Sequence, residues 1–381
     1  MGDIMLKRLP VLLLSLIILF NTQICAGAVS VSAQSAVLIE ASTGKILYEN
    51  NAYEKLPMAS TTKIMTAVTV LENAVLTDTV TVSANAAATE GSSMYLESGE
   101  KITVLELLYG LMLSSGNDAA NALAEHVSGN GADFPLLMNQ IAERIGMKSS
   151  NFVTPSGLDE SEHYSTAYDM AILTAYALKN DVFRKIVSTR SKTVGEGEDT
   201  HYLVNHNKLL GRYKYCIGVK TGYTMKSGRC LVSAAEKDGV RLIAVTLNDR
   251  NDWNDHIEML DYGFSCCEYA KFSDKAETFT LPVAGNGNTT VTEFKPFGKM
   301  LFGSEVCSVT RVIEMPRFLY PPIYRGTVVG YSNYYINGEL AESIEILADS
   351  DVGKVEEKSV FGKLEKWFAD ILLTERNKRY G

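Results

Sequence analysis

The sequence predicts an α+β protein in which an antiparallel sheet flanked by helices is followed by a small all-β domain and a C-terminal amphipathic helix. Three observations support this prediction. Strand patterns stand at both ends of the first 260 or so residues, with helical patterns between them. From residue 278 the chain changes to short alternating strands with turn residues, and residues 353–381 return to helical spacing. We therefore divide the chain into residues 29–276, 277–352 and 353–381, preceded by a leader, 1–28.

The first domain contains segments with the hydrophobic spacing of strands and segments with that of helices. Residues 37–40 and 46–49 are typical of a hairpin around Ser42-Thr43-Gly44. Three further strands are expected at 217–221, 231–235 and 242–247. Apolar residues at helical spacing predict the helices, at about 60–72, 103–113, 118–129, 133–145, 167–178 and 252–262.

The C-terminal third contains two different patterns. Strands are expected at 278–283, 306–312 and 326–346, the last bent at Asn337-Gly338, which is a strong hairpin dipeptide. In residues 354–381 one face is apolar and a basic end follows it, which favours a helix lying on a membrane surface. A helix docked on its own protein or on a second subunit is the alternative. The apolar face comprises Val360, Phe361, Leu364, Trp367, Phe368, Ile371 and Leu372.

The N-terminus has the three parts of a signal peptide. Lys7 and Arg8 precede an apolar run, and Ala26-Gly27-Ala28 is a small-x-small cleavage signal. An uncleaved anchor is the alternative. We expect an exported protein, peripheral at the outer face of the cytoplasmic membrane. Residues 1–28 also contain Asp3, so they carry a net charge of +1, and the chain without them has −10 in place of −9. An acidic exported protein is a poor candidate for nucleic-acid binding.

The cysteines indicate neither a metal nor a regular set of disulfides. Five remain after the leader is removed, an odd count, and Cys266 and Cys267 are adjacent. No Cys/His spacing is typical of zinc. We expect no metal and no cofactor.

The chemistry centres on Ser60 and Lys63. Ser60 and Thr61 suit the start of a helix, and Lys63 lies one turn after Ser60, so its amine can face the hydroxyl. A serine nucleophile needs a neighbouring base, and burial among the apolar residues that follow would lower the pKa of the lysine. A surface helix start with a solvated lysine is the alternative for this motif alone.

Two downstream triplets strengthen the catalytic interpretation. Ser115-Gly116-Asn117 stands between two predicted helices, although Ser128-Gly129-Asn130 repeats it as an expected helix C-cap. Lys220-Thr221-Gly222 ends a predicted strand, where a cation and a hydroxyl can hold an anion and glycine permits close approach. Ser-x-x-Lys, Ser-x-Asn and Lys-Thr-Gly in this order match the motif set of β-lactamases and penicillin-binding proteins.

The chain resembles the low-molecular-mass penicillin-binding proteins of the serine D-alanyl-D-alanine carboxypeptidase family. The resemblance covers essentially the whole chain after the leader and implies a β-lactamase/transpeptidase-like first domain. Two departures stand out: Thr154-Pro155-Ser156-Gly157-Leu158, where an Asn-Pro-His-Gly-Leu-like loop is usual, and Ser227 before Gly228, where alanine is usual. The resemblance is carried by residues 56–67, 115–120, 163–169 and 218–224.

The resemblance also implies a mechanism and partners. Ser60 attacks the terminal D-Ala-D-Ala bond of peptidoglycan stem peptides with Lys63 as base, and β-lactam antibiotics acylate the same serine. Ser115 and Asn117 relay the proton and orient the substrate, and the backbone amides of Ser60 and Tyr223 form the oxyanion hole. The expected carboxylate-binding residues are Lys220, Thr221 and Gly222, with Arg250 and His206 as weaker candidates.

Two other functions remain open from sequence. A β-lactamase needs a glutamate that activates the deacylating water, and Glu160 and Glu162 lie in a plausible loop without the expected local pattern. A wall-binding protein that has lost its enzymatic function is the second alternative. Failure to react with a penicillin would indicate the inactive wall-binding protein. Rapid penicillin hydrolysis would indicate the β-lactamase.

Overall fold

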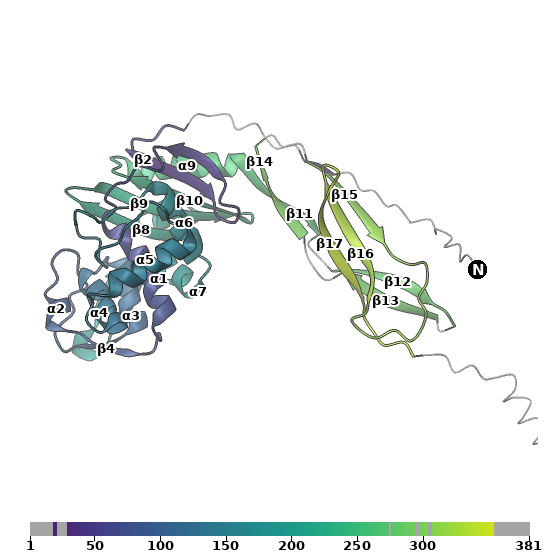
Figure 1. Cartoon of the computed structure of the whole chain (residues 1–381), viewed down its shortest axis with the longest axis horizontal. Helices are drawn as coiled ribbons and strands as arrows, with labels where there is room; N and C mark the ends of the chain where they lie inside the picture. Colours follow the sequence, from purple (N-terminus) through teal and green to yellow (C-terminus); the bar gives the residue numbers. More distant parts are fainter. Residues whose placement is uncertain are drawn as a thin grey trace, which may run out of the picture. The chain divides into compact units, whose positions relative to one another are not determined.

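The computed structural model describes residues 18–20, 29–273, 276–285, 287–293, 297–303 and 307–353. The chain forms two compact units, which are described separately. One comprises residues 22–269 and 300–305, and the other comprises 1–21, 270–299 and 306–381. Figure 1 shows the mixed α/β character of the first and the strand-rich second. The predicted α+β class is confirmed.

A five-stranded antiparallel sheet forms the centre of the first unit, in the order β3-β2-β10-β9-β8. The predicted first hairpin is present, and the buried carboxylate of Glu40 fixes its turn by accepting hydrogen bonds from the backbone amides of Ser42 and Thr43. Strand β8 lies at one edge of the sheet. The strands are β2 (Ser35–Glu40), β3 (Ile46–Asn50), β8 (Cys216–Thr224), β9 (Gly228–Lys237) and β10 (Val240–Leu247).

Helices cover both faces of this sheet, because alternate strand residues are apolar on each side. Leu38 and Leu242 pack against Met259 and Leu260 of α9 (Asp252–Cys266). The opposite face packs on the remaining helices. These are α1 (Lys63–Asn73), α3 (Val104–Leu113), α4 (Asn117–Ser128), α5 (Phe134–Ile145), α6 (Ala167–Ala177) and α7 (Asp181–Ser188), with the short α2 (Ala84–Ala87) and α8 (Leu209–Arg212) nearby.

Local sequence signals explain where several helices begin and end. Thr103 and Glu106 form a capping box at the start of α3. Gly129 ends α4 at φ 80°, so the second Ser-Gly-Asn copy is the predicted C-cap. Helix α7 was not predicted. The two small hairpins were also missed, β4 (Thr79–Thr81) with β5 (Lys101–Thr103) and β6 (Ser191–Val194) with β7 (His201–Val204).

The second unit contains a six-stranded sheet in the order β1-β15-β16-β17-β13-β12. Asn337 and Gly338 both have positive φ, which confirms the predicted hairpin turn. The strands are β12 (Glu277–Val283), β13 (Gly287–Glu293), β15 (Cys307–Glu314), β16 (Val328–Ile336) and β17 (Glu339–Ala348). Strand β13 was missed, as was a two-stranded sheet of β11 (Cys267–Ser273) with β14 (Phe297–Phe302).

Three features bear on the predicted termini and cysteines. Strand β1 (Ile18–Phe20) pairs with β15, although it belongs to the predicted leader, because an apolar segment can pair with an open sheet edge. Cys266 is disulfide-bonded, which the odd cysteine count did not indicate, whereas Cys216, Cys230 and Cys267 are free.

The rest of the leader and the predicted C-terminal helix lie outside the described residues. Within the described part, no helix is long and apolar enough to span a membrane.

Candidate active site

Ser60 lies in a tight 3₁₀ turn (η1, Ala59–Thr62) that leads directly into α1. Ala59 has a φ of 48°, a left-handed conformation that is rare for a residue with a Cβ atom. No side chain caps α1, so the predicted capping role of this segment is wrong. The Ser60 hydroxyl instead lies 3.0 Å from the amine of Lys63.

Lys63 is fully buried, and its amine makes hydrogen bonds to Asn117 and Ser156 besides the one to Ser60. The amine lies 2.7 Å from Oδ1 of Asn117 and 2.6 Å from the backbone carbonyl oxygen of Ser156. Burial lowers the pKa of Lys63 well below its ordinary value, and the nearby charge of Lys220 lowers it further. A neutral Lys63 can donate to Asn117 and Ser156 while its lone pair accepts the Ser60 proton. This arrangement is suited to activating a serine nucleophile.

The turn that carries Ser60 is held from behind by the loop at 154–158. Gly157 has a φ of 83°, and a Cβ atom there would lie 2.1 Å from the carbonyl oxygen of Ala59. Only glycine fits this position. Because Ser156 contacts Lys63 through its backbone carbonyl, the unusual residue at 156 leaves that contact intact. The second departure, Ser227, lies in the β8–β9 turn, where its hydroxyl accepts from the amide of Thr224.

Ser115 lines the same cleft as Ser60, and Asn117 contacts Lys63. Ser115 is buried with a φ of 60°, which turns the short α3–α4 connection toward Ser60. Asn117 accepts from Lys63 and donates through Nδ2 to the carbonyl oxygen of Glu90 at 2.7 Å. These two hydrogen bonds fix the orientation of the Asn117 amide.

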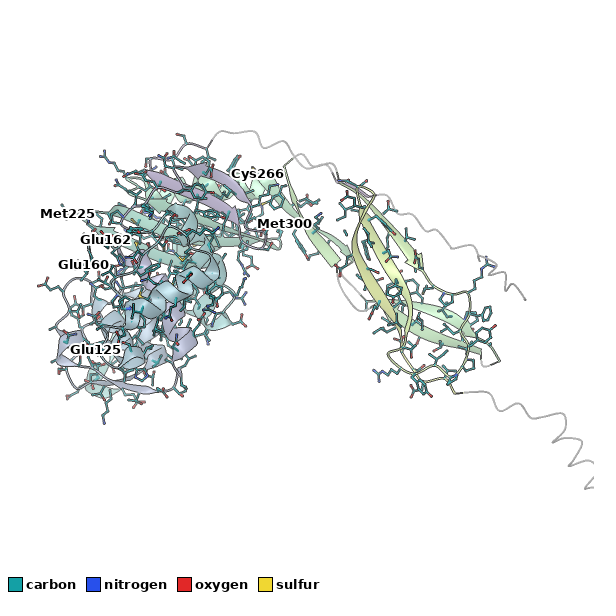
Figure 2. The ribbon with its side chains drawn as sticks, in the orientation of Figure 1. Glu125, Glu160, Glu162, Met225, Cys266 and Met300 are labelled. Atoms are coloured by element: carbon teal, nitrogen blue, oxygen red, sulfur yellow. The ribbon has the colours of Figure 1, made fainter. Side chains whose placement is uncertain are left out.

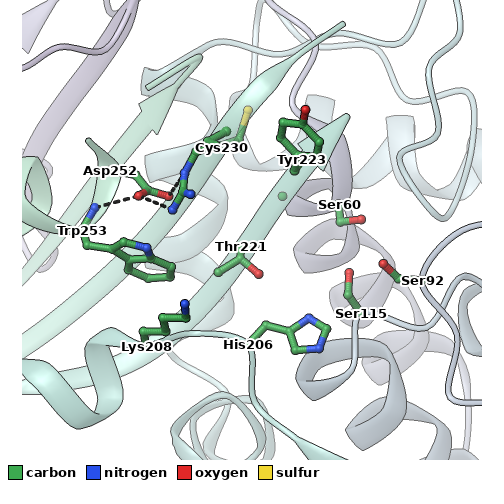
Figure 3. A pocket seen from close by; sticks show the side chains of 12 residues that line it. Ser60, Ser92, Ser115, His206, Lys208, Thr221, Tyr223, Cys230, Asp252 and Trp253 are labelled. Carbon is green, nitrogen blue, oxygen red and sulfur yellow. Dashed lines mark hydrogen bonds and ion pairs between the residues drawn. The ribbon is translucent and has the colours of Figure 1, made fainter. Parts of the chain in front are cut away.

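A cleft of about 620 Å³ opens in front of these residues (Figure 3). Gly222 of β8 forms one wall and packs against the turn η1, where a Cβ atom on Gly222 would lie 3.0 Å from the backbone nitrogens of Ser60 and Thr61. The lining residues are Ser60, Ser92, Ser115, His206, Lys208, Thr221, Gly222, Tyr223, Arg229, Cys230, Asp252 and Trp253.

Lys220 does not line this cleft. Its amine is buried and donates to the carbonyl oxygen of Thr221 at 2.9 Å, and burial lowers its pKa to about 7. Lys220 also lowers the pKa of His206, although burial has the larger effect on that ring. Lys220 therefore influences the site through its charge, while Thr221 lines the cleft.

The arginine of the cleft is Arg229 and not Arg250. Arg250 is exposed and lines no part of the cleft, so its predicted placement is wrong. Arg229 donates from Nε and Nη2 to the carboxylate of Asp252, at 3.1 and 2.6 Å (dashed lines at Asp252 in Figure 3). Its guanidinium also lies over the ring of Trp253. Arg229 pairs with Tyr223 across the β8–β9 hairpin. Counting residues outward from the turn between Thr224 and Gly228 in the sequence would have predicted that Tyr223 and Arg229 pair.

The cleft shows no features of a metal centre. No group of three or more His, Cys, Asp or Glu side chains in the described ranges is arranged to hold an ion. The reacting groups are instead a hydroxyl, an amine and an amide. A serine that faces a buried lysine with a lowered pKa, beside the edge strand β8, is typical of serine hydrolases that work through an acyl-enzyme.

The comparisons with known proteins identify the family. The model of the D-alanyl-D-alanine carboxypeptidase family, Peptidase S11, matches residues 22–251. The carboxypeptidase DacF of Bacillus subtilis is 36% identical and covers 84% of this chain and 86% of its own. DacC of Escherichia coli is 33% identical and covers 92% of each chain. The chain belongs to the D-alanyl-D-alanine carboxypeptidase family, as its motifs indicated.

A solved structure supports the same conclusion about the fold. Penicillin-binding protein 5 of Haemophilus influenzae is 29% identical to this chain, with a TM-score of 0.62. The match covers 86% of this chain and 100% of that one. It therefore includes part of the second unit, so the likeness extends beyond the region matched by the family model.

Proposed function

We propose that this protein is a serine D-alanyl-D-alanine carboxypeptidase that removes the terminal D-alanine from peptidoglycan stem peptides, with Ser60 as nucleophile and Lys63 as base. The 3.0 Å contact between the Ser60 hydroxyl and the buried Lys63 amine is the observation that supports it most directly. Family membership supports the reaction, and the site geometry supports the roles of the residues.

In the acylation step, Ser60 Oγ forms a bond to the carbonyl carbon while its proton passes to Nζ of neutral Lys63. The bond from that carbon to the D-alanine nitrogen then breaks. The leaving amine receives the proton from the Lys63 ammonium, and Ser115 is placed to relay it. In deacylation, water adds to the ester and the Ser60–carbon bond breaks. The attacking water gives its proton to Lys63, which passes it to Ser60 Oγ, so the serine hydroxyl is restored, the product leaves as a carboxylic acid and the cycle balances without a cofactor.

The charge that develops on the carbonyl oxygen needs donors close to Ser60. We assign this role to the backbone amides of Ser60 and Tyr223, since β8 packs tightly against the nucleophile turn at Gly222. Removing one oxyanion donor typically costs about 3–4 kcal/mol of transition-state stabilisation.

We assign recognition of the substrate carboxylate to Thr221 and Arg229. Both line the cleft, and Asp252 holds the Arg229 fork through Nε and Nη2, which leaves Nη1 available. Lys220 contributes positive potential nearby when it is protonated, whereas burial and the Lys220 charge lower the pKa of His206 and favour its neutral ring. A site of this kind selects a free C-terminus, because only a chain end carries an anion one residue beyond the cleaved bond.

A β-lactamase is less consistent with the cleft. Glu160 and Glu162 are both exposed and lie at the surface of the unit (Figure 2). Neither is among the residues that line the cleft. The cleft therefore offers neither of them for activating a deacylating water.

Two measurements test the proposed function together. Incubation with benzylpenicillin is expected to add one penicilloyl mass that persists, and diacetyl-L-Lys-D-Ala-D-Ala is expected to release D-alanine. Rapid loss of the adduct with hydrolysed penicillin would indicate a lactamase. Absence of both adduct and D-alanine release would contradict the proposal.

We further propose that the protein is exported to the outer face of the membrane and that residues 354–381 bind the membrane surface. The pattern of apolar and basic residues supports this second proposal.

A further inference from the structure

Tyr95 has a conformation that folding alone does not favour. Its φ is 67°, in the left-handed region, and its side chain is 83% exposed. For a residue with a bulky side chain this backbone conformation is strained, and glycine or asparagine adopts it at lower cost. The aromatic ring is also left largely in water.

The surrounding loop is rigidly attached to the fold. The buried carboxylate of Asp118 accepts hydrogen bonds from the backbone amides of Met94 and Leu96, at 3.1 Å each, and from the hydroxyl of Ser93 at 2.6 Å. Met94 and Leu96 are both buried. Because both neighbours of Tyr95 point inward, its ring is held outward. The strain is explained by these anchors, but the choice of tyrosine is not.

This loop continues directly into the cleft. The carbonyl oxygen of Ser92 accepts from the backbone amide of Asn117 at 2.7 Å, and Ser92 is part of the cleft lining. In Figure 3, Ser92 lies beside Ser60 and Ser115, on the side away from Asp252 and Trp253. If the substrate carboxylate lies toward Arg229, the acyl part of the substrate leaves the cleft past Ser92.

Other exposed apolar side chains come from the loops around this exit. Leu158 lies about 4.0 Å from a Cβ atom placed on Gly91, at the start of the Tyr95 loop. Tyr223 and Met225 are exposed on the β8–β9 side, and the Tyr223 hydroxyl contacts the Met225 sulfur (Figure 2 labels Met225). Exposed apolar side chains grouped around a cleft are typical of a binding surface.

We propose that Tyr95 is a specificity-determining residue that binds the glycan-linked part of the stem peptide, on the acyl side of the cleaved bond. A tyrosine ring offers a flat apolar face and a hydroxyl, which suit the faces and polar edges of a sugar or the backbone of a peptide. The inference rests on the proposed function. It adds that the enzyme prefers polymeric peptidoglycan to a short peptide that ends before it reaches Tyr95.

The test compares two substrates in the full chain and in Tyr95→Asn. Asparagine tolerates a positive φ, so the variant is expected to be at least as stable as the wild type in thermal unfolding. With diacetyl-L-Lys-D-Ala-D-Ala, kcat/KM is expected to stay within about two-fold. With pentapeptide-bearing glycan strands, D-alanine release is expected to fall about 5- to 30-fold, mainly through KM.

A matched control and four outcomes complete the test. Tyr202→Thr removes another exposed tyrosine, which lies on β7 and does not line the cleft, and it should leave both substrates unaffected. An unchanged rate on glycan strands in Tyr95→Asn would overturn the inference, as would an equal loss on both substrates. Loss of liposome binding with unchanged strand cleavage would instead assign Tyr95 to the membrane. If the wild type cleaves neither substrate, the proposed function itself has failed.

Discussion

The hydroxyl of Thr62 lies 2.8 Å from Nε2 of His163, which joins the nucleophile turn to a loop 101 residues further along the chain. Nδ1 of the same ring accepts from the backbone amide of Val153 at 3.0 Å, so Nε2 carries the proton and donates to Thr62. Thr62 in turn donates to the carbonyl oxygen of Ala59. A neutral His163 thus orients the turn that presents Ser60.

This contact predicts loss of stability in acid. Burial lowers the pKa of His163 to about 4, below its ordinary value of 6.5. Between these two values the unfolded chain binds the proton and the folded chain does not. The contribution of neutral His163 to the free energy of unfolding is therefore fully present above pH 6.5. It is lost as the pH falls toward 4, by on the order of 3 kcal/mol.

Denaturant unfolding from pH 4 to pH 7 measures this loss. His163→Gln should reduce the dependence of the unfolding free energy on pH. His126→Gln, which changes a ring on α4 outside this contact, should leave that dependence unchanged. His256 is buried with a pKa lowered to about 3, so part of the slope remains in every variant. An identical pH dependence in His163→Gln and the wild type would rule out the role of this ring.

Ser60→Ala is expected to abolish penicillin acylation and to lower kcat by at least about 10⁴-fold, with the fold intact. The reason is that Ser60 is the hydroxyl that lies beside the Lys63 amine. Intact-protein mass spectrometry after incubation with benzylpenicillin is the measurement. Ser92→Ala is the matched control, because Ser92 lines the same cleft and has no hydrogen bond to Lys63 among the described contacts. A penicilloyl adduct on Ser60→Ala would show that the nucleophile is another residue.

Lys220→Met is expected to move the acid limb of the acylation rate to higher pH. Acylation requires neutral Lys63, so the rate falls as the pH drops through the pKa of Lys63. The positive charge of Lys220 lowers that pKa, and methionine keeps the volume but removes the charge. The first-order acylation rate at saturating β-lactam, measured against pH, separates this effect from binding. A limb that stays in place would mean that burial alone sets the pKa of Lys63.

Arg229→Gln is expected to reduce the preference of the enzyme for a free C-terminus. Because Arg229 is partly exposed, we expect a loss of about 5- to 30-fold in kcat/KM on diacetyl-L-Lys-D-Ala-D-Ala. Its C-terminal amide should be cleaved slowly by both the wild type and the variant. Arg250→Gln, on the exposed arginine, is the control and should behave as the wild type. Equal cleavage of acid and amide by the wild type would contradict carboxylate recognition.

Truncation after Gly353 is expected to give a soluble enzyme with full activity on short peptides. The cut spares Val352, which exchanges backbone hydrogen bonds with Ile323 and would be lost by ending the chain at Asp351. Liposome flotation of the full and truncated chains tests the predicted membrane helix. Equal flotation of both, or loss of peptidase activity on truncation, would show that residues 354–381 pack on the protein.

The sequence alone was sufficient where the physics is local. Ser60 and Lys63 are one helical turn apart, so their contact follows from helix geometry. Gly129 ends α4 because glycine accepts a positive φ, and Asn337-Gly338 forms a hairpin turn for the same reason. The order of the three motifs also indicated the family, because each motif occupies a few consecutive residues.

Only the tertiary structure decided which distant residues complete the site. The register of β8 against β9 brings Arg229 opposite Tyr223 and into the cleft, whereas Arg250 points to solvent. The carbonyl oxygen of Ser156 reaches Lys63 through its backbone, which no side-chain pattern encodes. The lowered pKa of Lys63 depends on burial by the whole fold. A sequence specifies which groups are present, but distance and desolvation arise only when separate segments pack together.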